Sequence, residues 1–153
     1  MKPPEGFPEA GGKTARRALL DLIVAGTAPA PPCIDRLRLP NCDRWGPGWV
    51  TVDFVCTAEF AVRENTIFGG YIAALIDQYA GLVMLTLMPD DRDFLTGELT
   101  LEFLAPLAVG PVRVEAEATE LTRRHATVAV RLFQGGDLRC RGTATQIMRK
   151  VTT

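Results

Sequence analysis

Residues 69–88 read GGYIAALIDQYAGLVMLTLM, a run in which Asp77 is the only charged residue. A segment that is apolar on nearly every side is typical of a helix that the rest of a fold surrounds. An ionised carboxylate without partners is costly in such surroundings, so hydrogen bonds or a ligand must compensate. Asp77 is therefore a candidate nucleophile or general base.

Three interpretations of this run compete. The first is a membrane span, because a bilayer requires roughly 20 apolar residues. A central Asp, three glycines and the acidic exit at residues 89–93 argue against it. The second is a buried core helix whose Asp77 only caps or pairs, and the third is a buried helix that carries a catalytic acid. The residues of the run leave the last two open.

Length and composition predict one domain. The chain has 153 residues, 47% of them hydrophobic, with a net charge of -1, which gives no reason to expect nucleic acid as a partner. Its four cysteines form no CxxC pair and no metal-binding pattern with His, so we expect reduced thiols, no metal and a cytoplasmic protein. Residues 1–13 lack the apolar core of a signal peptide and are expected to be a flexible arm. Residues 14–153 are expected to form the single domain.

Hydrophobic periodicity predicts the order of elements. Helical spacing covers residues 14–25, with Thr14 as N-cap and an end at Gly26, and the Pro-rich residues 28–32 predict an extended linker. Alternation predicts strands at 50–56, 99–103, 112–119, 128–132 and 138–148, the last two joined by a hairpin turn at 134–137. This order predicts an α+β fold in which a curled antiparallel sheet wraps around the long central helix. A single curled sheet is expected to leave one strand edge and an apolar face uncovered, so we expect a homodimer or homotetramer.

Two motifs carry a family resemblance. Phe68-Gly69-Gly70 opens the apolar helix, with Asp77 at a fixed spacing behind it, and residues 96–107 read TGELTLEFLAPL before Gly110. In this order the motifs resemble those of the hotdog-fold acyl-CoA thioesterases of the phenylacetate-degradation and 4-hydroxybenzoyl-CoA group. The resemblance runs from about residue 49 to residue 148.

The resemblance implies roles for individual residues. Asp77 would be the nucleophile or the general base, the backbone N–H of Gly69 would polarise the thioester carbonyl, and Thr96 would hold the attacking water. Helix N-terminal amides suit the second role because they have no partner within the helix. The implied substrate is an acyl-CoA, and no cofactor is implied beyond the coenzyme A that the substrate carries. The remaining expected substrate contacts are Phe68, Gly70, Asn65, Arg123 and Arg124.

Several positions leave alternatives open. Phe68 replaces the family's His, and Val62 stands where relatives often have Asn or Gln. Asn65 could take over that polar contact or could serve a left-handed turn. Arg123 and Arg124 could bind the phosphates of coenzyme A or form a solvated turn.

The sequence therefore predicts a cytoplasmic acyl-CoA thioesterase with no membrane partner. The alternative is a non-catalytic acyl-CoA binding or sensing module on the same fold, which the loss of the family's His favours. A hotdog dehydratase would need a His paired with the acid, and the only histidine is His125. Tyr71, Tyr79 and Phe103 make an aromatic or medium-chain acyl group the expected cargo.

Overall fold

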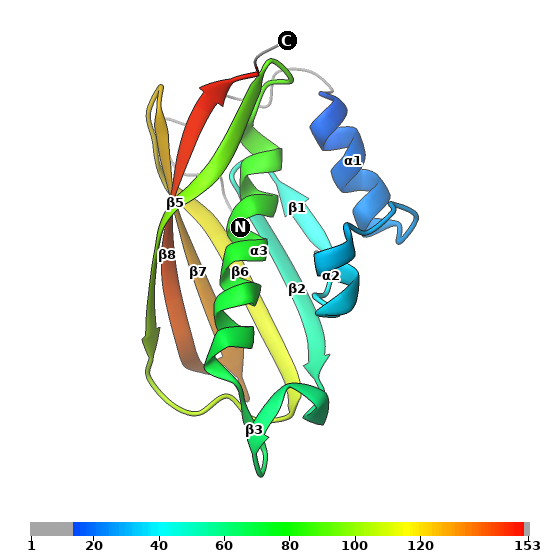
Figure 1. Ribbon diagram of the computed structural model, residues 1–153, viewed down its shortest axis with the longest axis vertical. Helices are drawn as coiled ribbons and strands as arrows, with labels where there is room; N and C mark the ends of the chain where they lie inside the picture. Colours follow the sequence, from blue (N-terminus) through cyan, green and yellow to red (C-terminus); the bar gives the residue numbers. More distant parts are fainter. Residues whose placement is uncertain (1–13, 152–153) are drawn as a thin grey trace.

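A single long helix, α3 (Gly69–Leu87), lies against a curved antiparallel sheet in the computed structural model, which describes residues 14–151 (Figure 1). The arm expected at residues 1–13 lies outside the described residues. The other helical elements are α1 (Ala15–Val24), α2 (Pro32–Arg36) and the 3-10 turn η1 (Ala58–Phe60). The strands are β1 (Arg44–Gly46), β2 (Trp49–Cys56), β3 (Ala61–Arg63), β4 (Thr66–Ile67), β5 (Arg92–Phe103), β6 (Gly110–Leu121), β7 (His125–Gln134) and β8 (Asp137–Lys150).

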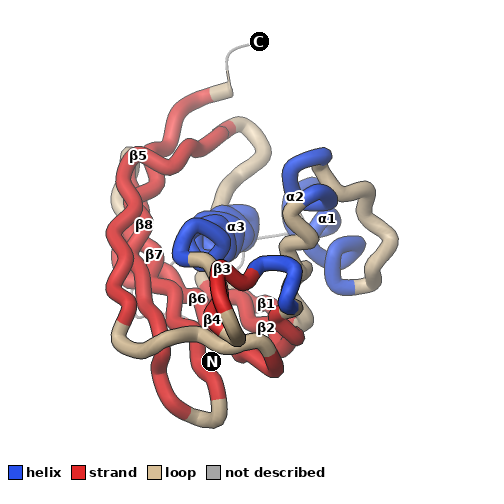
Figure 2. The backbone as a smooth tube through the Cα atoms, turned by 60° about the horizontal axis from the view of Figure 1, so that its bottom comes forward, coloured by secondary structure: helices blue, strands red, loops and turns tan. Residues whose placement is uncertain are grey.

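The main sheet has six strands in the order β1-β2-β6-β7-β8-β5, and β3 pairs with β4 separately. Every neighbouring pair in the main sheet is antiparallel. Figure 2 shows the sheet curving around one side of α3, with α1 and α2 on the other side. This is the predicted hotdog fold. The strand β5 follows α3 directly and lies at one edge of the sheet, where it pairs only with β8.

The side of α3 that faces the sheet forms the centre of the core. Leu75, Ile76 and Tyr79 are fully buried there. Gly142 of β8 permits the close approach, because a Cβ at this position would lie 2.8 Å from Cγ2 of Ile76. The Tyr79 hydroxyl donates a hydrogen bond of 2.8 Å to the carbonyl of Pro40. The helix α3 has the length and hydropathy of a membrane span. Of its most apolar 18 residues, however, 56% are buried in the fold, as is usual for the core helix of a globular domain.

Helix α1 closes the opposite side of α3. The Thr14 side chain accepts the N–H of Arg17, so the predicted N-cap is confirmed, and Gly26 just beyond the helix has a φ of 70°. Nε and Nη2 of Arg17 both donate to the carbonyl of Thr86 on α3 at 3.0 Å. The predicted linker is one residue shorter than expected because Pro32 begins α2, where its missing N–H costs nothing.

The outer face of the sheet is polar, contrary to the apolar face expected from one curled sheet. Arg113 forms a bidentate ion pair with Asp53, and Arg131 bridges Glu115 and Glu117. Several of the large exposed apolar side chains lie around the start of α3 and along β5 and the segment after it. These are Val62, Phe68, Leu95, Phe103 and Leu104.

Candidate active site

Asp77 lies on a flank of α3 beside the edge strand β5, and its side chain is exposed. The expectation that the single chain buries this carboxylate is therefore wrong. The reason is geometric, since the buried positions of α3 follow the stripe through Leu75, Ile76 and Tyr79, which faces the sheet. Asp77 is the polar end of the opposite stripe and is open to a ligand.

The hydroxyl of Thr96 on β5 donates a hydrogen bond of 2.7 Å to Oδ1 of Asp77. The residues 14–151 place no hydrogen-bond donor on Oδ2, so that oxygen is free to accept a proton or to attack a carbonyl. The register of β5 against β8 shifts between Thr96 and Glu98, which marks a bulge at Gly97. Bulges beside functional sites re-aim side chains, and here the bulge follows the residue that reaches across to α3. The structure thus joins Asp77 and Thr96, two residues for which the resemblance implies separate roles, by a direct hydrogen bond.

Gln146 of β8 is a member of the same hydrogen-bond network that sequence reasoning missed. It is fully buried, and its Nε2 lies 3.1 Å from Oγ1 of Thr96. The Thr96 hydroxyl has one proton, and the shorter bond to the charged Asp77 takes it, so Gln146 is the donor to Thr96. The alternation along β8 could have identified Gln146 as a buried polar residue, because it continues an inward-facing series of small residues at 140, 142 and 144.

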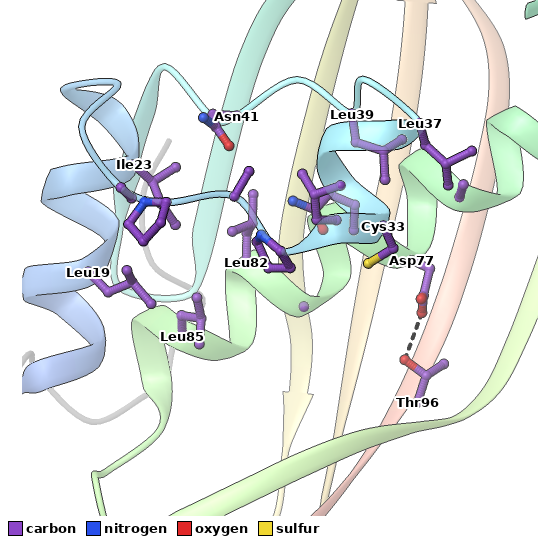
Figure 3. Close-up of a pocket in the computed structure, with 18 of the residues that line it drawn as sticks. Leu19, Ile23, Cys33, Leu37, Leu39, Asn41, Asp77, Leu82, Leu85 and Thr96 are labelled. Atoms are coloured by element: carbon purple, nitrogen blue, oxygen red, sulfur yellow. Dashed lines mark hydrogen bonds between the residues drawn. The ribbon is translucent and has the colours of Figure 1, made fainter.

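A cavity of about 640 Å³ opens beside Asp77 and Thr96 (Figure 3). Its walls come from α1, from the segment 28–39 that includes α2, from the outward stripe of α3 and from the start of β5. Most of the lining is aliphatic, including Leu19, Ile23 and Leu85. Asp77 and Thr96 lie at one end, and Leu19 and Leu85 lie toward the other, as Figure 3 shows. A carboxylate at one end of an apolar cavity is suited to act on a substrate whose apolar part fills the rest.

The second expected element is the N-terminus of α3. The carbonyl of Phe68 accepts the N–H groups of Tyr71 and Ile72, whereas the preceding amides of Gly69 and Gly70 have no partner within the helix. A Cβ at Gly70 would lie 2.4 Å from the Phe68 ring, so that half-exposed ring lies directly against the glycine. The two amides are available to a carbonyl oxygen, and the ring gives their surroundings an apolar character.

Asp77 and these amides are separated along one helix. Gly69 and Asp77 are eight residues apart, which corresponds to about 12 Å of helical rise. A reacting carbonyl must lie about 3 Å from both the attacking group and the oxyanion donors. One chain therefore cannot supply both groups to the same carbonyl.

Asn65 has a φ of 54°, and its Oδ1 accepts the N–H of Val109 at 3.1 Å. The turn interpretation of this residue is thus confirmed, and its amide oxygen is engaged by the backbone.

The basic turn at Arg123 and Arg124 is exposed and joins β6 to β7. Arg92 at the start of β5 donates to the carbonyl of Arg123 at 2.8 Å. Ala126 of β7 pairs with Gln146, which pairs with Thr96, so Ala126 lies two strand spacings, about 10 Å, from Thr96, and Arg124 is two residues farther along the chain. An extended cofactor arm can span that distance.

The two tyrosines of α3 do not line the cavity. Tyr71 stacks on Phe60 with 3.9 Å between ring centroids, and its hydroxyl donates to the carbonyl of Arg38. Burial raises the pKa of Tyr71 to about 12 and raises that of Tyr79 well above its ordinary value, so both remain neutral donors. Within residues 14–151, no group of three or more His, Cys, Asp or Glu side chains could hold a metal ion.

The model of the thioesterase superfamily matches residues 64–141, just over half of the 153 residues. The chain belongs to this superfamily. The matched region contains Asp77, Thr96 and the start of α3, but not α1, α2 or Gln146. The family expected from the motifs is thus confirmed.

Individual members of the thioesterase superfamily are similar to the chain to different degrees. An esterase predicted in Saccharolobus solfataricus is 35% identical over 83 residues, which span 54% of this chain and only 56% of that protein. A predicted thioesterase of Ralstonia eutropha, described as related to phenylacetic acid degradation, has a TM-score of 0.74 at 25% identity and covers 84% of this chain and 98% of its own. A variant of the phenylacetic acid degradation protein PaaI from Thermus thermophilus has a TM-score of 0.67 at 25% identity, covering 76% and 98%. A thioesterase of Streptococcus pneumoniae, solved with coenzyme A, shares the fold with a TM-score of 0.66 at 21% identity, covering 74% and 88%.

Proposed function

We propose that the protein is an acyl-CoA thioesterase that hydrolyses the thioester to a free acid and coenzyme A. The observation that carries the proposal is the Asp77–Thr96 pair at the end of an apolar cavity, with Oδ2 of Asp77 left free. Membership of the thioesterase superfamily supports the reaction type. The solved relative that contains coenzyme A supports the thiol component of the substrate.

In this proposal Asp77 is either the nucleophile or the general base. As a base, Oδ2 takes a proton from water, the water oxygen bonds to the thioester carbon, the carbon–sulfur bond breaks, and the proton passes to the departing thiolate of coenzyme A. As a nucleophile, Oδ2 itself bonds to that carbon and the carbon–sulfur bond breaks to release the thiolate. Water then hydrolyses the resulting anhydride to the free acid and the Asp77 carboxylate, and its remaining proton goes to the thiolate. In both cases the hydrogen bond from Thr96 holds Oδ1 and fixes the orientation of the free oxygen.

The oxyanion that forms on the thioester carbonyl needs donors, and the amides at the start of α3 are suited to provide them. Because Gly69 is about 12 Å of helix away from Asp77, the donors must come from a second copy of the chain. The proposal therefore includes a homodimer in which Asp77 of each subunit faces Gly69 of the other.

The strand β5 is suited to form this dimer. It has 12 residues, no other strand within residues 14–151 pairs with its outer edge, and exposed Leu95, Phe103 and Leu104 lie along it or directly after it. A two-fold axis between Leu99 and Thr100 would pair β5 antiparallel with its copy and would place Thr96 of one strand opposite Phe103 of the other. The Phe103 ring lies beside Gly69 of the same chain, because a Cβ built on Gly69 would lie 3.4 Å from Cζ of Phe103. Such pairing would bring Asp77 of one subunit toward Gly69 of its partner.

A panel of CoA thioesters, assayed for release of free thiol, tests the function. Hydrolysis of at least one acyl-CoA by the parent protein, with loss of activity in Asp77→Asn, is the expected result. The second candidate, a non-catalytic acyl-CoA binding module, is favoured by one observation, the apolar Phe68 ring against Gly70. Binding of acyl-CoA without turnover of any member of the panel would establish that alternative instead.

A further inference from the structure

The cavity follows one stripe of α3 away from Asp77. Asp77, Gly81 and Leu85 are spaced four residues apart and so lie on the same face of the helix. Leu19 of α1 closes the far end beside Leu85 (Figure 3). The cavity is therefore elongated along the helix, with the candidate catalytic carboxylate at one end.

Gly81 lies halfway along this stripe, and packing does not explain it. A glycine inside a helix costs about 0.5–1 kcal/mol relative to alanine. A Cβ at Gly81 would meet only Cε2 of Phe94 within 4 Å, at 3.8 Å, which is ordinary contact. The fold thus has room for a side chain here, and the glycine keeps the middle of the cavity open.

The lining indicates the chemical class of the occupant. Among the described residues that line the cavity there is no Lys or Arg, so an acyl group that ends in a carboxylate would have no counter-charge and would enter near the anionic Asp77. Phe94 contributes the only aromatic ring of that lining, so most of the surface is aliphatic. An uncharged aliphatic chain fits this surface.

The length of the stripe gives the length of that chain. From Asp77 to Leu85 the helix rises by about 12 Å. Three bonds of an extended chain span roughly 3.3–3.6 Å, so about ten bonds cover the distance from the thioester to the far end. Gly81 lies halfway, at about five bonds.

We propose that this cavity binds the acyl chain of an uncharged, medium-chain aliphatic thioester of about ten carbons, and that Gly81 determines how long a chain is accepted. The inference deepens the proposed function, on which it rests. It assigns substrate selection in part to α1 and α2, which lie outside the part of the chain matched by the superfamily model.

The test compares the parent with Gly81→Leu on straight-chain acyl-CoA thioesters from butyryl to dodecanoyl. Leucine in place of glycine favours the helix and fills the middle of the cavity. We expect kcat/KM for decanoyl-CoA to fall at least about tenfold while the value for butyryl-CoA stays within about threefold. Leu22→Ala, at an exposed position of α1 that does not line the cavity, is the control and should leave the profile unchanged. An equal loss at all chain lengths, or none, would overturn the inference and leave the proposed function standing.

A binding measurement makes the result independent of turnover. Cys33 lines the cavity next to Asp77 and is exposed, so its alkylation rate reports on occupancy (Figure 3). Saturating decanol should slow alkylation of Cys33 in the parent, butanol should not, and Gly81→Leu should abolish the protection. If the parent hydrolyses no thioester but decanol protects Cys33, the proposed function fails and the cavity assignment stands. Absence of protection in the parent would overturn the cavity assignment.

A separate observation carries a second inference, which concerns Gln146. A fully buried amide is costly unless it is hydrogen-bonded, and the partner of this amide is the Thr96 hydroxyl. The resulting chain runs from Nε2 of Gln146 to Oγ1 of Thr96 and on to Oδ1 of Asp77. Gln146 thereby fixes the direction in which the hydroxyl donates. We infer that Gln146 is a positioning residue, which acts on the reaction through Thr96.

A double-mutant cycle tests this role, since it measures the coupling between two contacting residues. Gln146→Met keeps the size and removes the donor, and it should lower kcat for a hydrolysed acyl-CoA at least about fivefold with little change in KM. In a Thr96→Val background the same change should lower kcat less than about twofold, because the residue through which it acts is gone. Equal losses in both backgrounds would show that Gln146 acts only through the fold and would overturn the inference. A parent without thioesterase activity would remove the proposed function and this inference together.

Discussion

Oγ1 of Thr96 lies 2.7 Å from Oδ1 of Asp77, across the space between β5 and α3. The two residues are far apart in sequence, and the bulge at Gly97 lies directly after the residue that makes the contact. A hydrogen bond to a charged group contributes about 1.5–3 kcal/mol, which is enough to hold one carboxylate rotamer. The candidate site is thus a hydrogen-bonded pair at one end of the cavity, both of whose residues line it.

The Thr96 hydroxyl can be removed without changing the shape of the side chain. Thr96→Val should lower kcat about 10- to 100-fold, as expected for the loss of a hydrogen bond to a carboxylate. Thr96→Ser keeps the hydroxyl and should stay within about fivefold of the parent. Steady-state kinetics on the best thioester of the panel gives both numbers. Equal activity of the valine and serine variants would separate Thr96 from the mechanism.

A site shared between subunits predicts complementation. Asp77→Asn and Gly69→Val, each inactive alone, should regain about a quarter of the parental activity when the two chains assemble at random, because each mixed dimer has one intact site. Co-expression with two different affinity tags allows the mixed dimer to be isolated, and its activity should then be about half that of the parent. The matched control is a mixed dimer of one Asp77→Asn chain and one Thr96→Val chain. Asp77 and Thr96 contribute to the same site from the same chain, so neither site of this dimer is intact. It should show no recovery beyond the residual activity of Thr96→Val. Light scattering must also show at least a dimer, and a stable monomer at micromolar concentration would contradict the shared site.

The basic turn between β6 and β7 predicts an effect on binding alone. Replacing both Arg123 and Arg124 with Ala should raise KM about three- to tenfold with kcat unchanged, since contacts to remote phosphates stabilise ground state and transition state alike. Arg113→Ala removes a positive charge from the outer sheet face and should leave KM unaltered. An unchanged KM in the double variant would leave Arg123 and Arg124 as a solvated turn.

The cysteines provide a pH-dependent test of the core. Burial raises the pKa of Cys42 and of Cys56 to about 11, whereas Cys33 is exposed. At pH 8 about one in a thousand of the Cys42 and Cys56 thiols is ionised, and burial also raises the pKa of the third buried thiol, Cys140. An alkylating reagent should therefore label the folded protein only at Cys33. Because the pKa values are raised in the folded state, that state keeps protons that the unfolded chain has released, and stability should fall as the pH rises from about 9 to 11. Mass spectrometry of the labelled protein and unfolding midpoints across this pH range check the two expectations.

Much of the fold could be predicted from the sequence because its signals are local. The alternation in residues 112–119 and 128–132 and the hairpin at 134–137 correspond to β6, β7 and their connection to β8. The short α2 is not predicted, because a five-residue helix gives no periodic signal and its first residue, Pro32, falls within the predicted linker. The polarity of the outer sheet face was missed because alternation shows that the two faces differ, but does not show which one packs against a helix.

The candidate site could be predicted only in part. Asp77 and Thr96 were found through motifs, and the structure places them in contact. The prediction that Asp77 is buried was wrong, because an apolar run does not show which side of a helix the fold leaves exposed. Gln146 and the cavity depend on contacts between segments that are distant in sequence, and no local pattern contains them.

The carboxylate of Asp77 is the group on which the account depends. Asp77→Asn preserves the shape of the side chain and its ability to accept a hydrogen bond from Thr96, but removes basicity and nucleophilicity. The kcat of Asp77→Asn on the best thioester of the panel should therefore fall at least about 100-fold, with acyl-CoA binding and the melting temperature nearly unchanged. Turnover within a few-fold of the parent, together with a shifted melting temperature, would show that Asp77 is a structural partner and would contradict the account.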